Sequence, residues 1–317
     1  MKQLIIRLNC IIGIGLLLLL GCNNSTVLKH TDTSTSGKIT IAVDESLKPI
    51  IEAEKEVFEA LYPNAKLTIE YTNEIHAIQL LSKDSARIAI VSRELNEDEK
   101  AYFDKQKLVP RTIIIGYDAI ALIMNKSRKD TILSLTQVKD LLTGNIINWQ
   151  QLNKSNSNEE IQVVFDNAQS GAIRFLKDSL LEGKNPAKNC YAVKNNPLVI
   201  EQVEKNQNTI GIIGVSWISD LDDSLSTNFL QKIQVINIIP KNPETAEATT
   251  MKPYQAYIAL KQYPLYRNIY IINPEGRYGL GTGFASFINS DKGQRIILKS
   301  GLVPAHAPIR IIQLNNK

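Results

Sequence analysis

The chain has 317 residues, of which 44% are hydrophobic and 21% are charged, with 36 Lys and Arg residues against 32 Asp and Glu residues. This composition excludes a disordered, collagen-like or coiled-coil chain, and so small a positive excess gives no reason to expect nucleic-acid binding. Three cysteines and three histidines are scattered along the sequence and form neither a disulfide framework nor a metal-binding pattern, so we expect no metal and no cofactor.

The first 21 residues have the pattern of a secretory leader. Lys2 and Arg7 give it a positive start, and the apolar run 11–20 that follows is too short to span a bilayer. The run leads into Gly21 and Cys22, which resemble the bacterial lipobox, where the cysteine carries the lipid; the alternative is a conventional signal peptide with an incidental cysteine. We therefore expect a mature chain that begins at Cys22 and is lipid-anchored on the extracytoplasmic side of a membrane in the bacterial cell envelope.

Residues 22–37 are predicted to form a flexible tether, because the segment is rich in Ser and Thr and has few apolar residues. From Lys38 onward, short β-rich runs alternate with helical stretches. The first strands are predicted at 39–43, 67–71 and 88–91, and the first helices at 49–61 and 75–81. Residues 96–99 have the pattern of a capping box that begins a third helix.

The same alternation continues to the end of the chain, which is long enough for two domains or one large one. Residues 112–124 form a long apolar stretch that is interrupted by Gly116, Tyr117 and Asp118. Further strands are predicted at 161–165, 209–215, 233–239 and 269–272, further helices at 135–142, 172–181 and 284–297, and a loop at 240–253. Gly144 is expected to stop the helix before it. Strands that alternate with helices predict the α/β class, with a parallel sheet covered by helices on both faces.

Four predicted loops between a strand and the next helix carry hydroxyl or amide side chains. In an open α/β sheet, ligands bind beyond the carboxyl ends of the strands, and a helix N-terminus beside a hydroxyl group is suited to an anion. Arg93 and Arg174 lie in or beside these loops and could contact a tetrahedral oxyanion. The alternative for each loop residue is a plain N-cap. The polar loop residues are Ser46, Thr72, Asn73, Ser92 and those from Asn167 to Ser170.

Six short segments, in order along the chain, resemble those of one family. They are IAIVSREL at 88–95, YDAIALI at 117–123, LTGNIINW at 142–149, QSGA at 169–172, SDKGQ at 290–294 and GLVP at 301–304. The ordered set covers roughly residues 38–310 and is similar to the phosphate-binding lipoproteins of bacterial phosphate ABC transporters, which have a periplasmic-binding-protein fold of type 2.

The resemblance implies two lobes, each a mostly parallel sheet flanked by helices, with the anion between them. Lobe one is expected at 38–116 and 257–317 and lobe two at 117–256, with Asp118 packed or hydrogen-bonded where the chain crosses between lobes. The resemblance further implies a monomer that binds phosphate or a similar oxyanion and delivers it to permease subunits of an ABC transporter. The ligands carried over are Ser46 with the Leu47 backbone, a residue within Thr72, Asn73 and Glu74, Ser92, Arg93, Ser170, Gly171 and Ala172.

The chain departs from the family's pattern at the proposed ligand positions. Asp166 stands where the family often has an arginine, Ala172 where it often has a threonine, and Ser92 where some members have an aspartate that accepts the phosphate proton. We expect Arg174 to supply the missing positive charge; the alternative is that Arg174 only forms an ion pair with Asp166. The proton acceptor is then expected to be one of three carboxylates, Glu74, Asp44 or Asp166.

Two other classes of function stay open at this point. A serine hydrolase could use Ser170 at a helix N-terminus, but the sequence has no G-x-S-x-G or H-E-x-x-H motif and no histidine with positional support as a base. We therefore expect no enzymatic activity. A membrane-tethered anion sensor that is not coupled to transport fits the same sequence features as a transport protein does.

Overall fold

The computed structural model describes residues 32–129, 131–153, 158–240 and 250–306. The predicted leader, Cys22 and most of the predicted tether lie outside the described residues, as does most of the predicted loop 240–253. In the part of the chain that is described, no helix has the length and apolar character that crossing a membrane requires.

A mixed sheet of ten strands forms the centre of the fold, in the order β2-β1-β3-β11-β4-β8-β6-β7, with β12 and β9 also paired to β4. The strands are β1 (Gly37–Asp44), β2 (Ala65–Thr72), β3 (Ile88–Val91), β4 (Arg111–Asn125), β6 (Gln162–Phe165), β7 (Cys190–Ala192), β8 (Thr209–Gly214), β9 (Ile233–Val235), β11 (Tyr266–Asn273) and β12 (Val303–Pro304). Two further short strands, β5 (Ile132–Ser134) and β10 (Asn237–Ile239), pair with each other.

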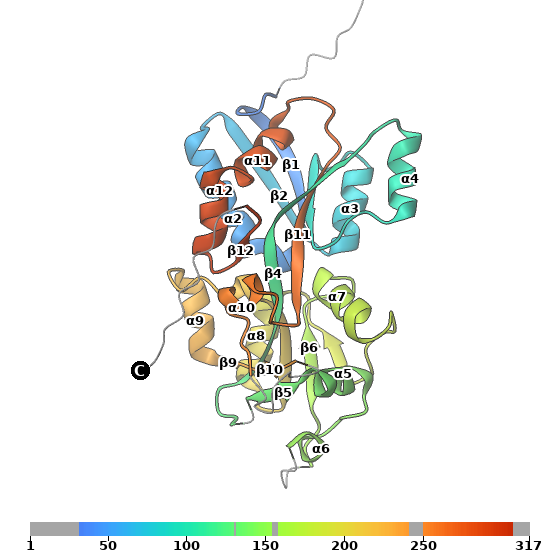
Figure 1. The fold of residues 1–317 in the computed structure, drawn as a ribbon, viewed down its shortest axis with the longest axis vertical. Coiled ribbons are helices and arrows are strands. Elements are labelled where there is room, and N and C mark those ends of the chain that lie inside the picture. Colours follow the sequence, from blue (N-terminus) through green and yellow to red (C-terminus); the bar gives the residue numbers. More distant parts are fainter. Residues whose placement is uncertain (1–31, 130, 154–157, 241–249, 307–317) are drawn as a thin grey trace, which may run out of the picture. The chain divides into compact units, whose positions relative to one another are not determined.

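The long strand β4 divides this sheet into two halves. Residues 111–119 of β4 pair with β11, and residues 120–124 pair with β8. In the first half, β1, β2 and β3 are parallel, and in the second half β6, β7 and β8 are parallel. Each half is therefore a mostly parallel sheet, as predicted, and the antiparallel strands β4 and β11 run between the halves (Figure 1).

Helices cover the sheet in both halves. They are α2 (Lys48–Leu61), α3 (Glu74–Ser82), α4 (Glu97–Lys105), α5 (Leu135–Thr143), α6 (Trp149–Asn153), α7 (Gly171–Leu180), α8 (Asn196–Lys205), α9 (Ser224–Lys232), α10 (Gln255–Ala259), α11 (Leu280–Ile288) and α12 (Asp291–Lys299), with the 3-10 turns η1 (Glu45–Leu47) and η2 (Val215–Trp217). In the first half, α2, α11 and α12 lie on one side of β1 and β2, and α3 and α4 lie on the other (Figure 1).

The sequence pattern explains why the strands lie between two layers of helices. All four residues of β3 and all six of β8 are buried, and both strands are continuous apolar or small-residue runs rather than alternating ones. Such runs are typical of parallel strands that have helices on both faces. The predicted capping box is confirmed, since the side chains of Asn96 and Glu99 each accept the other's backbone N–H, and Gly144 ends α5 with a left-handed φ of 78°.

Two predicted elements are wrong because each is divided in the structure. The predicted strand 233–239 is β9 and β10, because residues 233–235 pair with β4 whereas residues 237–239 pair with β5. The predicted helix 284–297 is α11 and α12, which are separated by Asn289 and Ser290. A side chain at Gly293 would lie 2.5 Å from the Ile288 carbonyl oxygen, so this glycine permits the second helix to turn back against the first.

The end of the predicted tether contacts the folded part of the chain. Asp32 accepts the backbone N–H of Leu280 at the start of α11, at 2.9 Å, and its carboxylate forms an ion pair with Arg277 at 2.5 Å. An acidic side chain at a helix N-terminus is favoured by the helix dipole. The end of the predicted tether from Asp32 onward is therefore part of the folded structure, several residues before the predicted first strand.

Glu54 of α2 generates a prediction about stability. Its side chain is fully buried, and neither carboxylate oxygen has a hydrogen-bond partner. Burial raises the pKa of Glu54 to about 9. Because the folded-state pKa lies above the unfolded value, the folded protein retains a proton that the unfolded chain releases. The associated stability is present below about pH 4.5 and is lost as the pH rises toward 9.

We expect the free energy of unfolding to fall between pH 6 and pH 9 by up to about 1.4 kcal/mol per pH unit through this group. Glu54→Gln removes the titrating group with little change of shape, so its unfolding free energy should fall less over that range. Urea denaturation at the two pH values measures both. Glu56→Gln is the matched control, because Glu56 is exposed on the same helix. An equal fall in the wild-type protein and Glu54→Gln would contradict the assignment.

Candidate functional site

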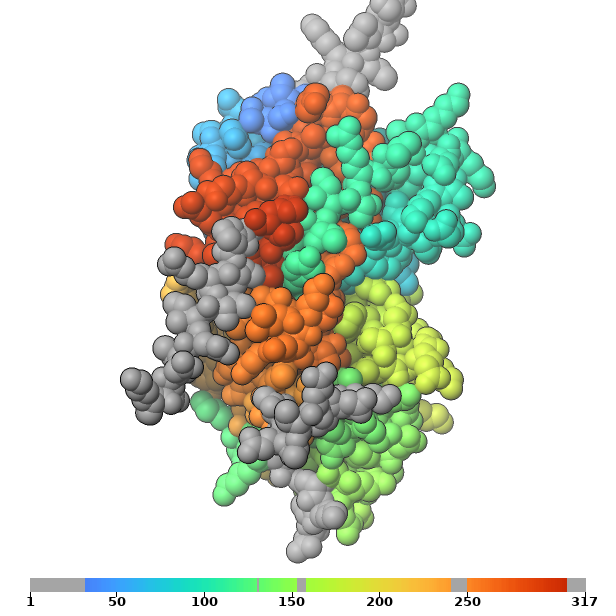
Figure 2. All heavy atoms as spheres, viewed as in Figure 1, coloured from blue at the N-terminus to red at the C-terminus, as the bar shows by residue number. Residues whose placement is uncertain are grey.

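The candidate site lies where strand ends from both halves of the sheet meet the N-terminus of α7. We call the contact between the end of β1, Glu74, Ser92 and the first turn of α7 the junction. The backbone N–H of Gly171 in α7 donates to Asp44 Oδ2 at the end of β1, at 2.7 Å. In the space-filling view, the α7 segment (yellow-green) and the α3 segment (cyan) adjoin one another (Figure 2). The sequence predicts the ligand at this edge of the sheet.

Asp44 is the first of two buried carboxylates at the junction. Its Oδ1 accepts the backbone N–H of Ser46 at 2.9 Å and the hydroxyl of Ser46 at 2.5 Å. Burial, followed by the charge of Glu74, raises the pKa of Asp44, and the hydrogen bonds and the positive charge of Arg267 oppose that rise. The Asp44 carboxylate thus lies at the positive end of the α7 dipole, where an anion is favoured.

Glu74 is the second buried carboxylate. It is the first residue of α3, and its side chain is fully buried. Glu74 Oε2 accepts the backbone N–H and the hydroxyl of Ser92, at 3.0 and 2.6 Å. Glu74 Oε1 accepts Nε of Arg174 at 2.5 Å and lies 3.4 Å from Nε of Arg93. Glu74 therefore joins groups from both halves of the sheet.

Arg174 reaches across the junction from α7. Its Nη2 donates to the hydroxyl of Ser92 at 3.1 Å, and its Nη1 donates to Asp178 at 2.8 Å. The expected alternative, an ion pair of Arg174 with Asp166, is wrong: Asp166 is buried at the start of the loop before α7 and accepts the hydroxyl of Ser170 at 2.7 Å. Burial, followed by the charge of Asp44, raises the pKa of Asp166 to about 7.

The other predicted ligand residues have more local roles. Ser170 caps α7, with its Oγ accepting the Ile173 N–H, and Asn73 caps α3 through the N–H of His76. These two residues fit the plain N-cap alternative. Leu47 and Ala172 are buried among core residues, and Thr72 pairs with Asp44 at the ends of β1 and β2. The guanidinium of Arg93 binds Glu99 at 2.7 Å in addition to its contact with Glu74.

Arg267 of β11 was not among the predicted site residues, although it lies directly beside the junction. It is buried, forms an ion pair with Asp118 of β4 at 2.7 Å, and donates from Nη2 to the hydroxyl of Ser46 at 2.8 Å. Burial alone would lower the pKa of Arg267, but the charge of Asp118 raises it. The available signal was an arginine within an otherwise largely apolar strand, YRNIYIIN. Asp118 does make a hydrogen-bonded contact between the crossing strands, as expected.

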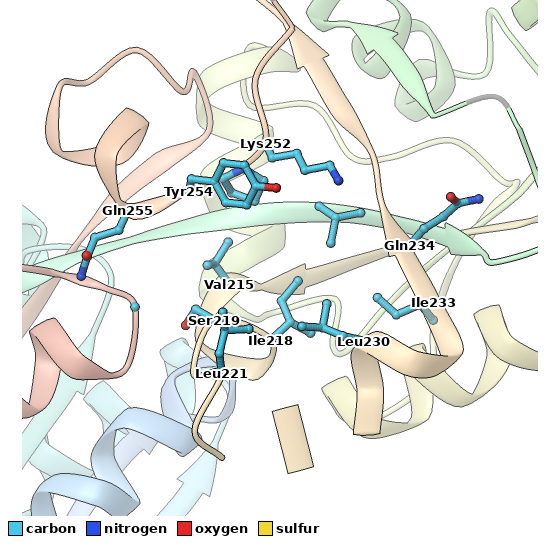
Figure 3. Close-up of a pocket in the computed structure, with 13 residues that line it drawn as sticks. Val215, Ile218, Ser219, Leu221, Leu230, Ile233, Gln234, Lys252, Tyr254 and Gln255 are labelled. Carbon is cyan, nitrogen blue, oxygen red and sulfur yellow. The ribbon is translucent and has the colours of Figure 1, made fainter. Parts of the chain in front are cut away.

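A separate apolar groove in the second half has a volume of about 520 Å³. Its walls include Val215, Ile218 and Leu230, with Tyr254 and Lys252 above them (Figure 3). None of the residues that line it belongs to the junction. In the described part of the chain, no group of three or more His, Cys, Asp or Glu side chains is placed to hold a metal ion.

The junction can therefore bind negatively charged oxygen atoms through hydroxyl, backbone N–H and guanidinium groups. The fold brings five of the predicted ligand residues together there. They are Ser46, Ser92, Gly171, Arg93 and Arg174. In the described structure, Ser46 and Gly171 donate to Asp44, and Ser92 and Arg174 donate to Glu74. Arg93 lies near Glu74, but its guanidinium donates hydrogen bonds to Glu99. The chemistry is that of an anion site whose hydrogen bonds are made to the protein's own carboxylates.

Among curated proteins, the chain is similar to the phosphate-binding protein PstS 2 of Streptococcus agalactiae, with 34% identity over 120 residues, which is 38% of this chain and 39% of that relative. The chain thus matches about two fifths of the length of this relative. It is 22% identical to the phosphate-binding protein PstS of Pseudomonas aeruginosa over 292 residues, which is 87% of this chain and 86% of the relative.

Solved structures share the fold. A structure with bound phosphate from Clostridium perfringens, assigned to the substrate-binding proteins of phosphate ABC transporters, has a TM-score of 0.69 and 24% identity and covers 85% of this chain and 100% of its own. An ABC-type phosphate transport receptor from Vibrio cholerae has a TM-score of 0.62 and 22% identity, and covers 84% and 100%. The predicted two-lobed α/β class is confirmed by these folds.

A family match extends over most of the chain. Residues 29–292 match the PBP superfamily domain. This range contains all of the junction and both crossing strands. The family resemblance seen in the sequence is confirmed, and the chain belongs to the PBP superfamily.

Proposed function

We propose that this chain binds inorganic phosphate, or a similar tetrahedral oxyanion, at the junction and delivers it to the permease of an ABC transporter. The observation that carries the proposal is the convergence of donors from both halves of the sheet on one buried place: Ser46 and Ser92 from the first half, and Gly171 and Arg174 from the second. The relatives that match over most of their length are named phosphate-binding proteins, which supports the same ligand.

The proposed ligand can reach the junction only if the two halves separate. Asp44, Ser46 and Glu74 are fully buried, and Ser92 is 6% exposed. We propose that the lobes are residues 38–116 with 257–317 and residues 117–256, and that they open by bending where β4 and β11 cross between them. Hinges of this kind use a few residues at element ends. We also propose that the protein is a monomer and that it is a binding protein rather than an enzyme.

We also propose that Cys22 carries a lipid that holds the protein on the extracytoplasmic side of a membrane. The support is the charged start, the short apolar run and the Gly-Cys pair of the leader. More than one acyl chain is needed for stable anchoring. A lipid-anchored binding protein would remain close to a permease in the same membrane.

The ligand proposal is tested by isothermal titration calorimetry at pH 6 with phosphate, sulfate and molybdate. The wild-type protein should bind one phosphate. Ser92→Ala removes one hydroxyl donor, and a hydrogen bond to a charged group is worth about 1.5–3 kcal/mol, so the Kd should rise roughly 10- to 150-fold. Ser82→Ala is the control, because the Ser82 hydroxyl donates to the Ile78 carbonyl within α3. Equal phosphate affinity in Ser92→Ala and Ser82→Ala would remove Ser92 from the site.

Closure of the junction is tested by Gly171→Ala. A Cβ atom there would lie 2.4 Å from Ser92 Oγ and 2.8 Å from Glu74 Oε2, so the first turn of α7 could no longer approach the first half of the sheet. Overpacking typically costs about 1–3 kcal/mol, so phosphate affinity should fall roughly 5- to 150-fold while the helix content in circular dichroism is unchanged. Gly276→Ala, where a Cβ atom would meet nothing within 4 Å, should bind as the wild type does. If both variants bind equally, the closed contact is not needed for binding.

The anchor is tested by Cys22→Ala in cells that express the full chain. Without the thiol no lipid can be attached, so the protein should move from the membrane fraction to the soluble fraction. Cys190→Ala is the control, since Cys190 is a free, half-buried cysteine of the folded part. Retention of Cys22→Ala in the membrane fraction would contradict the lipid anchor.

A further inference from the structure

We infer that the carboxylates of Asp44 and Glu74 are internal competitors of the ligand, so that the junction binds a tetrahedral oxyanion only when the acidic groups around it take up at least one proton. This inference rests on the proposed function, because it concerns how the same site selects its anion. It differs from a role in which a carboxylate merely accepts a proton of phosphate, since it requires that removal of the carboxylate strengthens binding.

The hydrogen-bond donors of the junction already have acceptors within the protein. Asp44 accepts from the N–H and hydroxyl of Ser46 and from the N–H of Gly171. Glu74 accepts from the N–H and hydroxyl of Ser92 and from the guanidinium of Arg174. These are the donors that an external oxyanion would need. An anion at this place must therefore compete with two carboxylates that the chain itself supplies.

The closed junction leaves little space between α7 and Ser92. A single Cβ atom added at Gly171 would already lie 2.4 Å from Ser92 Oγ, 2.8 Å from Glu74 Oε2 and 2.9 Å from Asp44 Oδ2. A tetrahedral oxyanion is larger than one methyl group, so it cannot fit between α7 and Ser92 while both carboxylates keep these positions. Ligand binding therefore requires that at least one carboxylate gives up its hydrogen bonds.

Acidic groups outnumber basic groups around the junction. Acidic groups come from β1 and η1, from α3 and α4, from β4, from the loop after β6 and from α7, whereas the basic groups are three arginines and one exposed lysine at the start of α2. The acidic groups are Asp44, Glu45, Glu74, Glu99, Asp118, Asp166 and Asp178, and the basic groups are Arg93, Arg174, Arg267 and Lys48. Asp44, Glu74, Asp118 and Asp166 are buried, whereas of these three arginines only Arg267 is buried and Arg93 and Arg174 are partly buried. An added anion therefore meets several buried carboxylates, and its charge is better tolerated when they take up protons.

The raised pKa values of acidic groups around the junction agree with proton uptake near neutral pH. Burial raises the pKa of Asp44 and of Glu45, and burial with the charge of Asp44 raises the pKa of Asp166 to about 7. A further negative charge beside these groups would raise their pKa values again, so anion binding and protonation favour each other. Affinity must then fall as the pH rises.

The donors also indicate an anion rather than a cation as the external ligand. Backbone N–H groups, hydroxyl groups and guanidinium groups are directed at the carboxylate oxygen atoms. If a cation drew the carboxylates away, these buried donors would lose their acceptors, which is costly. An oxyanion that replaces a carboxylate supplies new acceptors to the same donors.

The test compares phosphate and sulfate binding by calorimetry from pH 5 to pH 8 in the wild type, Glu74→Gln and Asp44→Asn, with Glu97→Gln on the exposed face of α4 as the matched control. Wild-type sulfate affinity should fall by roughly tenfold per pH unit for each proton taken up. Glu74→Gln keeps the size of the side chain and removes its charge, so at pH 8 it should bind either anion at least about tenfold more tightly than Glu97→Gln does. Its pH dependence should also be flatter.

Proton uptake is measured directly by titrating sulfate in buffers of different ionisation enthalpy, because sulfate itself does not titrate in this range. The wild type should take up at least about one proton per sulfate at pH 7, and Glu74→Gln should take up fewer. This measurement on the wild type decides the inference even if a variant fails to fold. Binding of anions by the wild type without proton uptake would overturn it.

The outcomes separate the inference from the proposed function. Phosphate binding that is weaker in both Glu74→Gln and Asp44→Asn at every pH would show that the carboxylates are acceptors for the ligand, which overturns the competition and leaves the proposed function standing. Binding in Glu74→Gln but not in the wild type at pH 8 would support the competition. If neither the wild type nor any variant binds phosphate or sulfate between pH 5 and pH 8, both proposals fail.

Discussion

The buried ion pair between Arg267 and Asp118 links the two crossing strands to the candidate site. The two residues are direct cross-strand neighbours in the β4–β11 register, and both side chains are at most 1% exposed. Loss of one partner would leave a buried charge without compensation, at a cost of about 3–5 kcal/mol. Because Arg267 also donates to the hydroxyl of Ser46, the position of that hydroxyl depends on where β4 and β11 cross.

The same hydrogen bonds that would hold a ligand also close the junction. Gly171 and Arg174 of the second half are tied to Asp44 and Glu74 of the first by charge-assisted bonds, which are stronger than neutral ones. The α7 dipole adds a positive end directed at Asp44. Closure and the proposed anion binding therefore depend on one set of contacts, and a substitution in that set is expected to change both.

Local chemistry accounts for the parts of the fold and site that were predictable. The capping box at 96–99, the helix stop at Gly144 and the apolar strands β3 and β8 each depend on neighbouring residues. Ser92 was predicted because polar side chains just beyond a strand lie at the ligand-binding edge of an α/β sheet, whereas Gly171 was implied only by the family resemblance. The break between α11 and α12 was missed because it depends on how Gly293 packs against Ile288, which no local pattern encodes.

The sequence by itself determined the α/β class, the order of most elements and the edge of the sheet at which anion donors gather, since periodicity, capping residues and turn glycines act over a few residues. Only the tertiary structure decided which charges meet there. Arg174 is bound to Glu74, 100 residues away, rather than to Asp166, and Arg267 lies beside Ser46 from 221 residues away. Such pairings follow from the register of β4 with β11 and from the contact of the two halves, and both are set by packing across the whole chain.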